Sequence, residues 1–357
     1  MKFLRSEGEL KQLQALPLEV KEQKALRRIE EYLDVYGTDG TYISFSGGKD
    51  SIVLDHLIQR VTGSSHAVER VYLDTFMEYP KMRSFVKENY QVTVIKPAQT
   101  PKKMILGENG VGWAFPSKDV SQIIYYARRG RKWALNKLHG LTKDGEYSEY
   151  RQRYKKFLPV YERRDIVISP FCCVKQKEEP VLEFERLTGK HPFIGTRASE
   201  SRRRTEAWMR VGGCNSFDTR ITVNEDGEEE EIIVDRPQSK PISIFSEQDI
   251  LHYIVKYNLA LPSPYGEIYE VGRCVGQEDL FTKMGMCHGY DGCMLKTSGE
   301  QRTGCIFCPI GCHLDNFAKF KRLRKAEPKL YDFCMEELHE KELLEMVQSI
   351  FGGNIYK

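Results

Sequence analysis

The sequence lacks the features that would place it in a membrane or in the secretory pathway. No stretch approaches the roughly 20 consecutive apolar residues that cross a bilayer. The opening MKFLRSEGELKQ has no apolar run of the signal-peptide kind. An excess of charge of one sign is also absent, because 54 basic and 51 acidic residues leave a net charge of only +3. We therefore expect a cytoplasmic protein without a membrane partner, in which any affinity for nucleic acid depends on local charge.

The ten cysteines are many for a chain of 357 residues without a secretory signal. Because cytoplasmic thiols are kept reduced, this number favours metal or cluster ligation over a disulfide framework. Several lie in a glycine-rich stretch between residues 272 and 312, and four of these thiols could form a zinc (Zn²⁺) site: Cys287, Cys293, Cys305, Cys308 and Cys312. The isolated Cys214 and Cys334 are expected to be small buried hydrophobic residues, and Cys274 is likewise left out of any site.

Alternating helical and β-prone segments predict the fold class. Residues 18–36 have apolar side chains at near-helical spacing and end before Gly37, which is typical of an amphipathic helix with a glycine stop. The β-prone run TYISF is followed by a glycine-rich turn and then by a second helical segment. Further β-prone runs alternate with helical segments, at residues 71–73, 92–95, 166–168 and 193–194. The alternation predicts a Rossmann-like α/β fold with a doubly wound, mostly parallel sheet.

Other segments depart from this alternation. Residues 98–165 are polar, basic and aromatic without an obvious strand, which indicates a mainly helical insertion. Residues 217–235 show two β-prone runs around an Asn-Glu-Asp-Gly turn, typical of a surface hairpin. We therefore divide the chain into four parts: an N-terminal helix (1–36), a nucleotide-binding domain that carries the glycine-rich turn (37–97 and 166–260), the basic insertion (98–165) and a Cys-rich, helical C-terminal region (261–357).

The glycine-rich turn between residues 46 and 51 has the composition of a phosphate-binding loop. Glycines without a Cβ allow backbone N–H groups to approach phosphate oxygens, and the start of the following helix adds favourable partial charge. Lys49 would add a cation, while Ser46 and Ser51 would supply hydroxyl donors. The pattern GxxxxGK[ST] is absent, so the loop is not a Walker A motif. The alternative is that the loop binds no phosphate and is an ordinary strand-to-helix turn.

SGGKDS resembles the signature of the PP-loop ATP pyrophosphatases, which cleave ATP between its α and β phosphates. VYLDTFMEYP, FCCVKQKEEPV and FIGTRASESRRR resemble segments of the phosphoadenosine phosphosulfate (PAPS) reductase branch of that group. The resemblance implies an adenine nucleotide alpha hydrolase-like fold, with ATP and Mg²⁺ as ligands. It implies catalytic roles for four residues: Lys49, Asp50, Ser51 and Arg197. It also implies nucleotide contacts from a wider set: Ser44, Ser46, Gly47, Gly48, Lys49, Asp50, Ser51, Asp74, Thr75, Gly195, Arg197, Arg202 and Arg203.

The arginines of the last segment suit this role, because planar guanidinium groups offer paired donors to phosphate or sulfate oxygens. Surface salt bridges are the alternative role for one or two of the four arginines: Arg197, Arg202, Arg203 and Arg204.

Four cysteines resemble, in order, the ligand set of the assimilatory adenylylsulfate reductases, which hold a [4Fe-4S] cluster with an adjacent pair and a C-x-x-C pair. The matching positions are Cys172, Cys173, Cys305 and Cys308. The resemblance therefore implies an iron–sulfur cluster on these thiolates, and the zinc site described above remains the alternative.

Two departures from the reductases favour ATP over a sulfonucleotide as substrate. Those enzymes carry a mobile cysteine in a Glu-Cys-Gly-Leu-His type tail, whereas this chain ends in FGGNIYK. They have also generally lost the full SGGxDS pattern, which is complete here. The first hypothesis is thus ATP-dependent sulfur transfer or nucleic-acid modification, served by a sulfur-donor or reductant protein. The alternatives are a thiol-dependent sulfonucleotide reductase, and a non-catalytic nucleotide-binding module of a nucleic-acid or defence complex with structural zinc.

A basic and aromatic segment, residues 125–156, is the candidate nucleic-acid surface. It interleaves lysines and arginines with rings, and such residues can bind phosphates and stack on bases. The rings named in this interpretation are Tyr125, Tyr126, Trp133 and Tyr154. A solvated helix pair whose rings pack on the rest of the protein is the alternative, and nothing in the segment separates DNA from RNA.

Overall fold

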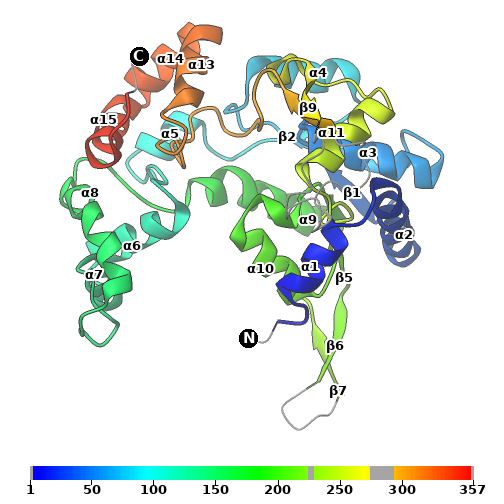
Figure 1. The fold of residues 1–357 in the computed structure, drawn as a ribbon, viewed down its shortest axis with the longest axis horizontal. Helices are drawn as coiled ribbons and strands as arrows, with labels where there is room; N and C mark the ends of the chain where they lie inside the picture. Colours follow the sequence, from blue (N-terminus) through cyan, green and yellow to red (C-terminus); the bar gives the residue numbers. More distant parts are fainter. Residues whose placement is uncertain (1–2, 224–228, 274–292, 355–357) are drawn as a thin grey trace. The chain divides into compact units, whose positions relative to one another are not determined.

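The computed structural model describes residues 3–223, 229–273 and 293–354 (Figure 1). The chain divides into two compact units. The sheet unit comprises Met1–Leu73, Tyr79–Ile95 and Glu183–Thr303. The helical unit comprises Asp74–Glu78, Lys96–Leu182 and Gly304–Lys357. Each unit is therefore built from segments that lie far apart in the sequence.

A six-stranded sheet forms the centre of the sheet unit. Its strands are β1 (Thr41–Ser44), β2 (Glu69–Leu73), β3 (Thr93–Ile95), β4 (His191–Ile194), β5 (Asn215–Ser216) and β8 (Gln238–Ser239). Their order is β3-β2-β1-β4-β8-β5, and every neighbouring pair is parallel except β8 and β5. The chain thus runs from β1 outward to β3 and then returns to the other side of β1. The predicted doubly wound, mostly parallel α/β fold is confirmed.

Helices cover both faces of this sheet. Adjacent residues of a strand point to opposite faces. Tyr42 of β1 packs edge-on against Phe184, whereas Phe193 of β4, beside Ile43, packs against Tyr32 on the other face. The helices of the sheet unit are α1 (Glu7–Gln14), α2 (Leu18–Tyr36), α3 (Lys49–Thr62), α4 (Pro80–Asn89), α10 (Arg202–Val211) and α11 (Glu247–Lys256), and α9 (Glu179–Thr188) enters it from the helical unit.

The predicted helix over residues 18–36 is confirmed as α2, which ends at Gly37 with φ of +69°. Its buried residues recur every three or four positions and join the apolar core between helices and sheet, as shown by Ala25, Ile29 and Tyr32, each 0% exposed. Burial of this stripe is what holds α2 against the sheet.

Two antiparallel strand pairs accompany the central sheet. Strands β6 (Thr219–Val223) and β7 (Glu229–Ile233) pair in antiparallel fashion, which confirms the hairpin predicted over 217–235, although its turn lies outside the described residues. Strands β9 (Ile268–Arg273) and β10 (Cys293–Thr297) form the second pair. Figure 1 shows β6 and β7 extending away from the sheet as a two-stranded ribbon.

The helical unit confirms the predicted helical insertion. It contains α5 (Pro101–Leu106), α6 (Lys118–Arg128), α7 (Lys132–Leu138), η1 (Glu149–Phe157), α8 (Leu158–Glu162), η2 (Val174–Glu178), α13 (Ala318–Ala326), α14 (Pro328–Asp332), η5 (Phe333–Glu337) and α15 (Glu340–Phe351). The strand predicted at residues 166–168 is wrong: only an isolated bridge joins Ile168 to Trp113. The run lies outside the parallel sheet: Ile168 is buried, but Val167 is 50% exposed. The four-part division of the chain stays a prediction.

No helix in the described ranges is both long enough and apolar enough to span a bilayer.

Candidate functional site

The glycine-rich loop leaves β1 at its carboxyl end, where Ser44 is the last strand residue, and enters α3 at Lys49. Gly47 has a φ of +71°, and a Cβ on it would lie 2.3 Å from Val86 Cγ2, so only glycine fits there. Ser51 Oγ donates to the Gly48 carbonyl at 2.8 Å and closes the turn. The sequence-predicted order of strand, small loop and helix is confirmed.

The end of β4 lies directly beside this loop. A Cβ on Gly195 would approach the Asp50 carbonyl oxygen to 3.1 Å, which explains a glycine at that position. The close approach brings Arg197, two residues further on, to the start of α3. Since the strand order reverses between β1 and β4, the two segments flank the crevice in which open α/β sheets bind their ligands.

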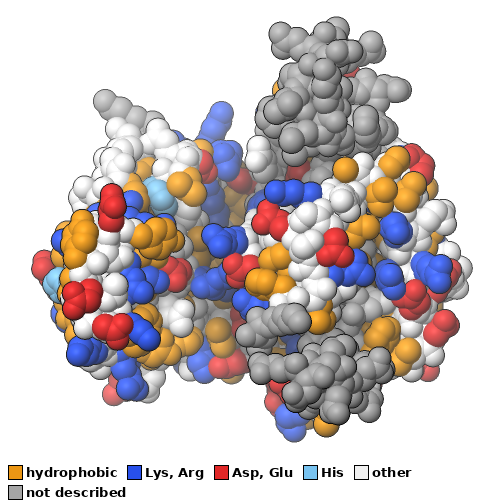
Figure 2. Space-filling view, turned by 60° about the horizontal axis from the view of Figure 1, so that its bottom comes forward, with side chains coloured by type: hydrophobic (Ala, Val, Ile, Leu, Met, Phe, Trp, Pro, Cys, Tyr) orange, Lys and Arg blue, Asp and Glu red, His pale blue; other side chains and the backbone are white. Residues whose placement is uncertain are grey.

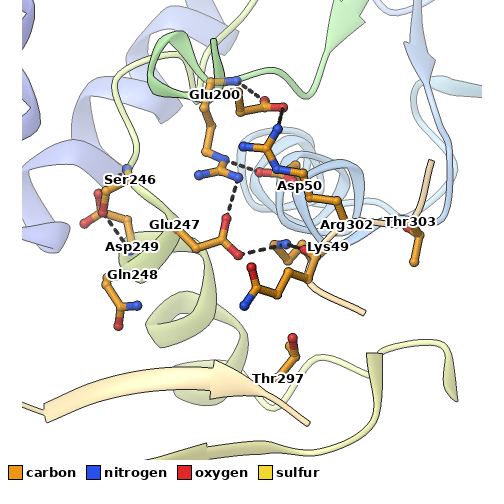
Figure 3. A network of polar contacts seen from close by, with 12 residues as sticks. Lys49, Asp50, Glu200, Ser246, Glu247, Gln248, Asp249, Thr297, Arg302 and Thr303 are labelled. Atoms are coloured by element: carbon orange, nitrogen blue, oxygen red, sulfur yellow. Dashed lines mark hydrogen bonds and ion pairs between the residues drawn. The ribbon is translucent and has the colours of Figure 1, made fainter. Parts of the chain in front are cut away.

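Charged side chains converge on the start of α3 (Figure 3). The Arg197 Nε atom donates to Asp50 Oδ1, and Arg197 Nη2 lies 2.5 Å from Glu247 Oε2. The other oxygen of Glu247 lies 2.8 Å from Lys49 Nζ. Lys49 and Arg197 are 1% and 3% exposed, whereas the Glu247 side chain is 39% exposed. One carboxylate in contact with solvent thus bridges the two buried cations that a phosphate group would need.

The electrostatics of the network follow from this geometry. Burial raises the pKa of Asp50, against the opposing effect of Arg197 and Lys49. Burial also acts to raise the pKa of Glu247, but Lys49 and Arg197 outweigh it and the pKa is lowered. Burial acts to lower the pKa of Arg197, yet Asp50 and Glu247 raise it. Glu247 is therefore a carboxylate and Arg197 a cation at neutral pH.

A second segment of the sheet unit covers Lys49. The Lys49 backbone N–H donates to Tyr265 Oη at 3.2 Å, and its ammonium donates to the Gln301 carbonyl. Tyr265 Oη also lies 2.7 Å from Thr303 Oγ1. Oxygen atoms of the chain itself therefore bind the donors of the loop, in the way that phosphate oxygens would.

Sequence reasoning did not find Glu247, Tyr265 or Gln301 as part of the site. The segment around Glu247 begins a helix, since Ser246 caps α11 in a capping box with Asp249. A carboxylate in the first turn of a helix is common because it interacts with the helix dipole. Only its position opposite Lys49 distinguishes Glu247 from any other such residue.

The remaining predicted nucleotide contacts lie as follows. Asp74 and Thr75 follow the carboxyl end of β2, both are buried, and Thr75 Oγ1 donates to Glu78. Arg202 is 92% exposed on α10 and pairs with Glu206. Arg203 is also exposed on α10. The roles assigned to these four residues stay predictions.

Four cysteines of the helical unit line one cavity, together with apolar side chains such as Met77, Ile105 and Phe307. They are the four predicted cluster ligands: Cys172, Cys173, Cys305 and Cys308. The adjacent pair lies just before η2, and the C-x-x-C pair lies in the segment that precedes α13, so folding brings together two sequence segments separated by more than 100 residues.

The surroundings of these thiols favour negative charge at Cys173 alone of the four, because the hydrogen bond with Cys173 raises the pKa of Cys172 and burial raises the pKa of Cys305 and Cys308. A hydrogen bond from Cys172 lowers the pKa of the Cys173 thiol, and Lys118 and Lys177 lower it further against the effect of burial. Lys319 donates to the Cys305 carbonyl at 2.5 Å. Four cysteine sulfur atoms around one cavity are nevertheless a donor set that fits a metal-containing group, since a bound metal stabilises the thiolate form.

The alternative zinc site would need cysteines beyond the four that line this cavity. Cys293 lies on β10 in the sheet unit, Cys312 is buried in the helical unit, and Cys287 lies outside the described residues. Among the described residues, no three His, Cys, Asp or Glu side chains lie close enough together to hold a single metal ion. Both Cys214 and Cys334 were expected to be buried hydrophobic residues. Cys334 is fully buried, as predicted, whereas Cys214 is only partly buried.

Comparison with known proteins identifies the family. Residues 40–314 match the model of the phosphoadenosine phosphosulfate reductase domain. The chain belongs to this family. Phosphoadenosine phosphosulfate reductase-like proteins are nucleotide-binding enzymes, and the sheet, the loop and Arg197 are the parts of this member described above. No match was found among proteins with curated descriptions.

Two solved structures are similar to this family member. One is the PAPS reductase from Candida auris in a phosphate complex, with 15% identity over 72% of this chain and 90% of that chain and a TM-score of 0.33. The other is the FMN adenylyltransferase from Candida glabrata with FAD and inorganic pyrophosphate, with 11% identity over 72% of this chain and 69% of that chain and a TM-score of 0.36.

The basic insertion of this PAPS reductase-like chain is partly a packed structure. Tyr154 is 5% exposed, and the Arg128 guanidinium donates to four backbone carbonyls, so these two residues hold the insertion together. Other rings are accessible: Trp133 is 42%, Tyr147 69% and Tyr150 67% exposed. On the face shown in Figure 2, Lys and Arg side chains are interspersed with acidic ones.

Proposed function

We propose that this member of the PAPS reductase-like family binds ATP and cleaves it to AMP and pyrophosphate, in order to activate an acceptor for sulfur transfer or nucleic-acid modification. The observation that carries the proposal is the assembly of the complete Ser-Gly-Gly-Lys-Asp-Ser loop with Arg197 at the crevice between β1 and β4. The donors and cations there suit a leaving pyrophosphate, whose charge grows as the bond to the α-phosphorus breaks.

The chemistry assigns a role to each group. An acceptor oxygen attacks the α-phosphorus of ATP, the bond to the bridging oxygen of the β-phosphate breaks, and pyrophosphate leaves as the acceptor adenylate forms. A sulfur nucleophile from a donor protein then displaces AMP from the activated acceptor. Lys49 and the N–H groups at the start of α3 bind the departing pyrophosphate, and Arg197 orients the remaining anionic groups. Asp50 is the candidate partner of the Mg²⁺ that accompanies the phosphates.

The four cysteines that line the cavity are proposed to hold a [4Fe-4S] cluster. Each thiolate of such a cluster binds its own iron atom, so the thiols need not lie as close together as the ligands of one ion. The nearby lysines would offset the negative charge of a cluster with four thiolate ligands. A bound cluster would supply either redox chemistry or a site for an additional sulfur.

Nucleic acid is the acceptor class that we propose, and the insertion is its binding surface. Residues 98–165 contain 15 basic and seven acidic residues, although the whole chain carries only +3. Exposed rings lie beside cations, since the Arg153 guanidinium carbon lies 3.9 Å from the centre of the Tyr150 ring. Rings and cations in this combination bind single strands by stacking and charge. Tyr150→Ala should weaken the binding of a labelled oligonucleotide, measured by fluorescence anisotropy, whereas Val167→Ala at another exposed position should not.

One anaerobic preparation tests the proposal. The visible spectrum and the iron and sulfide content report the cluster, and incubation with ATP and Mg²⁺, with and without nucleic acid, reports AMP and pyrophosphate. We expect iron in the wild-type protein and its loss in Cys305→Ser. Pyrophosphate release should disappear in Asp50→Asn and persist in Arg27→Ala, a change at an exposed residue of α2. A folded protein that binds nucleotide without any turnover would contradict the proposal and leave the binding-module hypothesis.

Thiol-dependent reduction of a sulfonucleotide is the second candidate, and the family match favours it. In that reaction a cysteine thiolate attacks the sulfur of the sulfonucleotide and releases the adenine nucleotide, and a second thiol then releases sulfite as a disulfide forms. Sulfite production from adenylylsulfate or PAPS and a dithiol, without ATP cleavage, would establish this activity in place of the first.

A further inference from the structure

A small cavity of about 40 Å³ lies behind Arg197, next to the exit of β4. Its walls come from α10 and from the residues that flank β8, and include Arg204, Trp208, Cys214 and Lys240. A single water molecule needs roughly 10–15 Å³ by this measure, so the cavity has room for an ion of a few atoms but not for a nucleoside. All of these residues belong to the sheet unit.

The cavity has an unbalanced positive charge. Among the described side chains, no carboxylate lies within ion-pair distance of the Lys240 ammonium. Arg204, in contrast, pairs with Glu200, and Arg236 pairs with Glu185. The Lys240 side chain is partly buried, and charges removed from water are normally paired, so a lysine beside a cavity with no counter-ion among the described side chains indicates that an anion belongs there.

Trp208, which lines the same cavity, carries a hydrogen-bond donor that no described residue uses. Trp208 is 5% exposed, and its indole Nε1 is buried without a hydrogen-bond partner among the residues that the structure describes. An indole N–H can only donate, and a buried donor without an acceptor costs free energy. Ser243 Oγ, 3.2 Å from Cys214 Sγ, adds a hydroxyl that can rotate toward a ligand. The missing partner is therefore an acceptor with negative charge.

We propose that this cavity binds a small oxyanion of the sulfate, sulfite or phosphate type, held by the Lys240 ammonium and the Trp208 indole N–H. The ion is either free or the anionic end of a substrate that also reaches the crevice, because Arg197 lines the cavity and also binds Asp50 and Glu247. The proposal does not depend on ATP cleavage.

Sulfate is the probe. The protein is titrated with sodium sulfate at constant ionic strength, balanced with chloride, while its tryptophan fluorescence is recorded, and binding is repeated by calorimetry. We expect a saturable fluorescence change that is absent in Trp208→Phe, which identifies the responding ring among the three tryptophans. Lys240→Met should weaken sulfate binding at least about tenfold, since it removes the unpaired charge. Lys24→Met, at an exposed lysine of α2, is the matched control and should bind sulfate as the wild type does.

The pH dependence gives a separate readout. Burial, together with Arg236 and Arg204, lowers the pKa of Lys240 to about 8. Cys214 beside it stays a neutral thiol, because burial raises its pKa. Since the ion binds the protonated amine, affinity for sulfate should be full below pH 8 and fall as the pH rises above it, and Lys240→Met should remove this dependence.

Addition of ATP distinguishes the two sources of the ion. Unchanged sulfate binding in its presence supports a free ion, and competition supports the anionic end of the nucleotide. The proposal is overturned if folded wild-type protein shows no saturable sulfate response, or if sulfate binds Lys240→Met and Trp208→Phe as tightly as it binds the wild type. Circular dichroism confirms that each variant is folded, and Trp208→Phe provides the second variant if Lys240→Met is not. Loss of ATP turnover alone bears only on the proposed function.

Discussion

Glu247→Gln should tighten the binding of inorganic pyrophosphate to the glycine-rich loop. In the structure the Glu247 carboxylate bridges Lys49 and Arg197, and both of these cations must release it before phosphate oxygens can take its place. Glutamine has the same shape but no charge. The variant therefore removes an internal competitor and leaves the buried cations in position.

The magnitude follows from the exposure of the carboxylate. Because 39% of the Glu247 side chain is in contact with solvent, each of its two ion pairs is screened and contributes about 1 kcal/mol or less. The two ion pairs together thus hold the Glu247 carboxylate, which phosphate must displace, by about 1–2 kcal/mol. This range includes the value of about 1.4 kcal/mol that corresponds to a factor of ten in affinity. We expect the dissociation constant for pyrophosphate to fall about tenfold.

Calorimetric titration with pyrophosphate, at fixed ionic strength and neutral pH, measures this change. Glu206→Gln, which removes a carboxylate that pairs with exposed arginines on α10, is the matched control and should leave the affinity unchanged. Equal or weaker binding by Glu247→Gln would refute the reasoning. It would mean that Glu247 holds Lys49 and Arg197 in their binding positions, and that its charge does not compete with phosphate.

Other predictions concern stability and the loop. Glu22 is buried and accepts hydrogen bonds from Arg60, Lys256 and Tyr257. Glu22→Ala should therefore lower the free energy of unfolding, measured by urea denaturation, by about 2 kcal/mol. Glu19→Ala, at an exposed position, should change it by less than about 0.5 kcal/mol. Burial acts to raise the pKa of Glu22, but these partners outweigh it and lower the pKa below 4.5. The difference in the free energy of unfolding between the wild type and Glu22→Gln should therefore be full above that pH and shrink as the pH falls further. Gly47→Ala should abolish pyrophosphate binding in calorimetry, because its Cβ would meet Val86. Adding Val86→Ala to the same chain should restore part of the affinity. Full binding by Gly47→Ala alone would contradict the loop geometry.

Much of the fold could be predicted because it depends on local patterns. Helix α2 is visible as an apolar stripe that stops at Gly37, and the loop is visible as glycines between a β-prone run and a helical one. The strand predicted at residues 166–168 failed for the same reason: a β-prone run becomes a strand only where a neighbouring strand accepts its hydrogen bonds, and within the described part of the chain Trp113 alone bridges to this run.

The candidate site divides in a similar way. The sequence by itself determined the loop as a candidate, because its glycines, lysine and serines suit phosphate chemistry, and its resemblance to known families added Arg197 and the four cysteines. Tertiary structure alone decided that Glu247 lies opposite Lys49, that Tyr265 and Gln301 bind the donors of the loop, and that Lys240 lines a cavity where no described carboxylate pairs with it. The physical reason is that charge neutralisation and burial depend on distances between segments that are remote in the chain, and no local pattern encodes those distances.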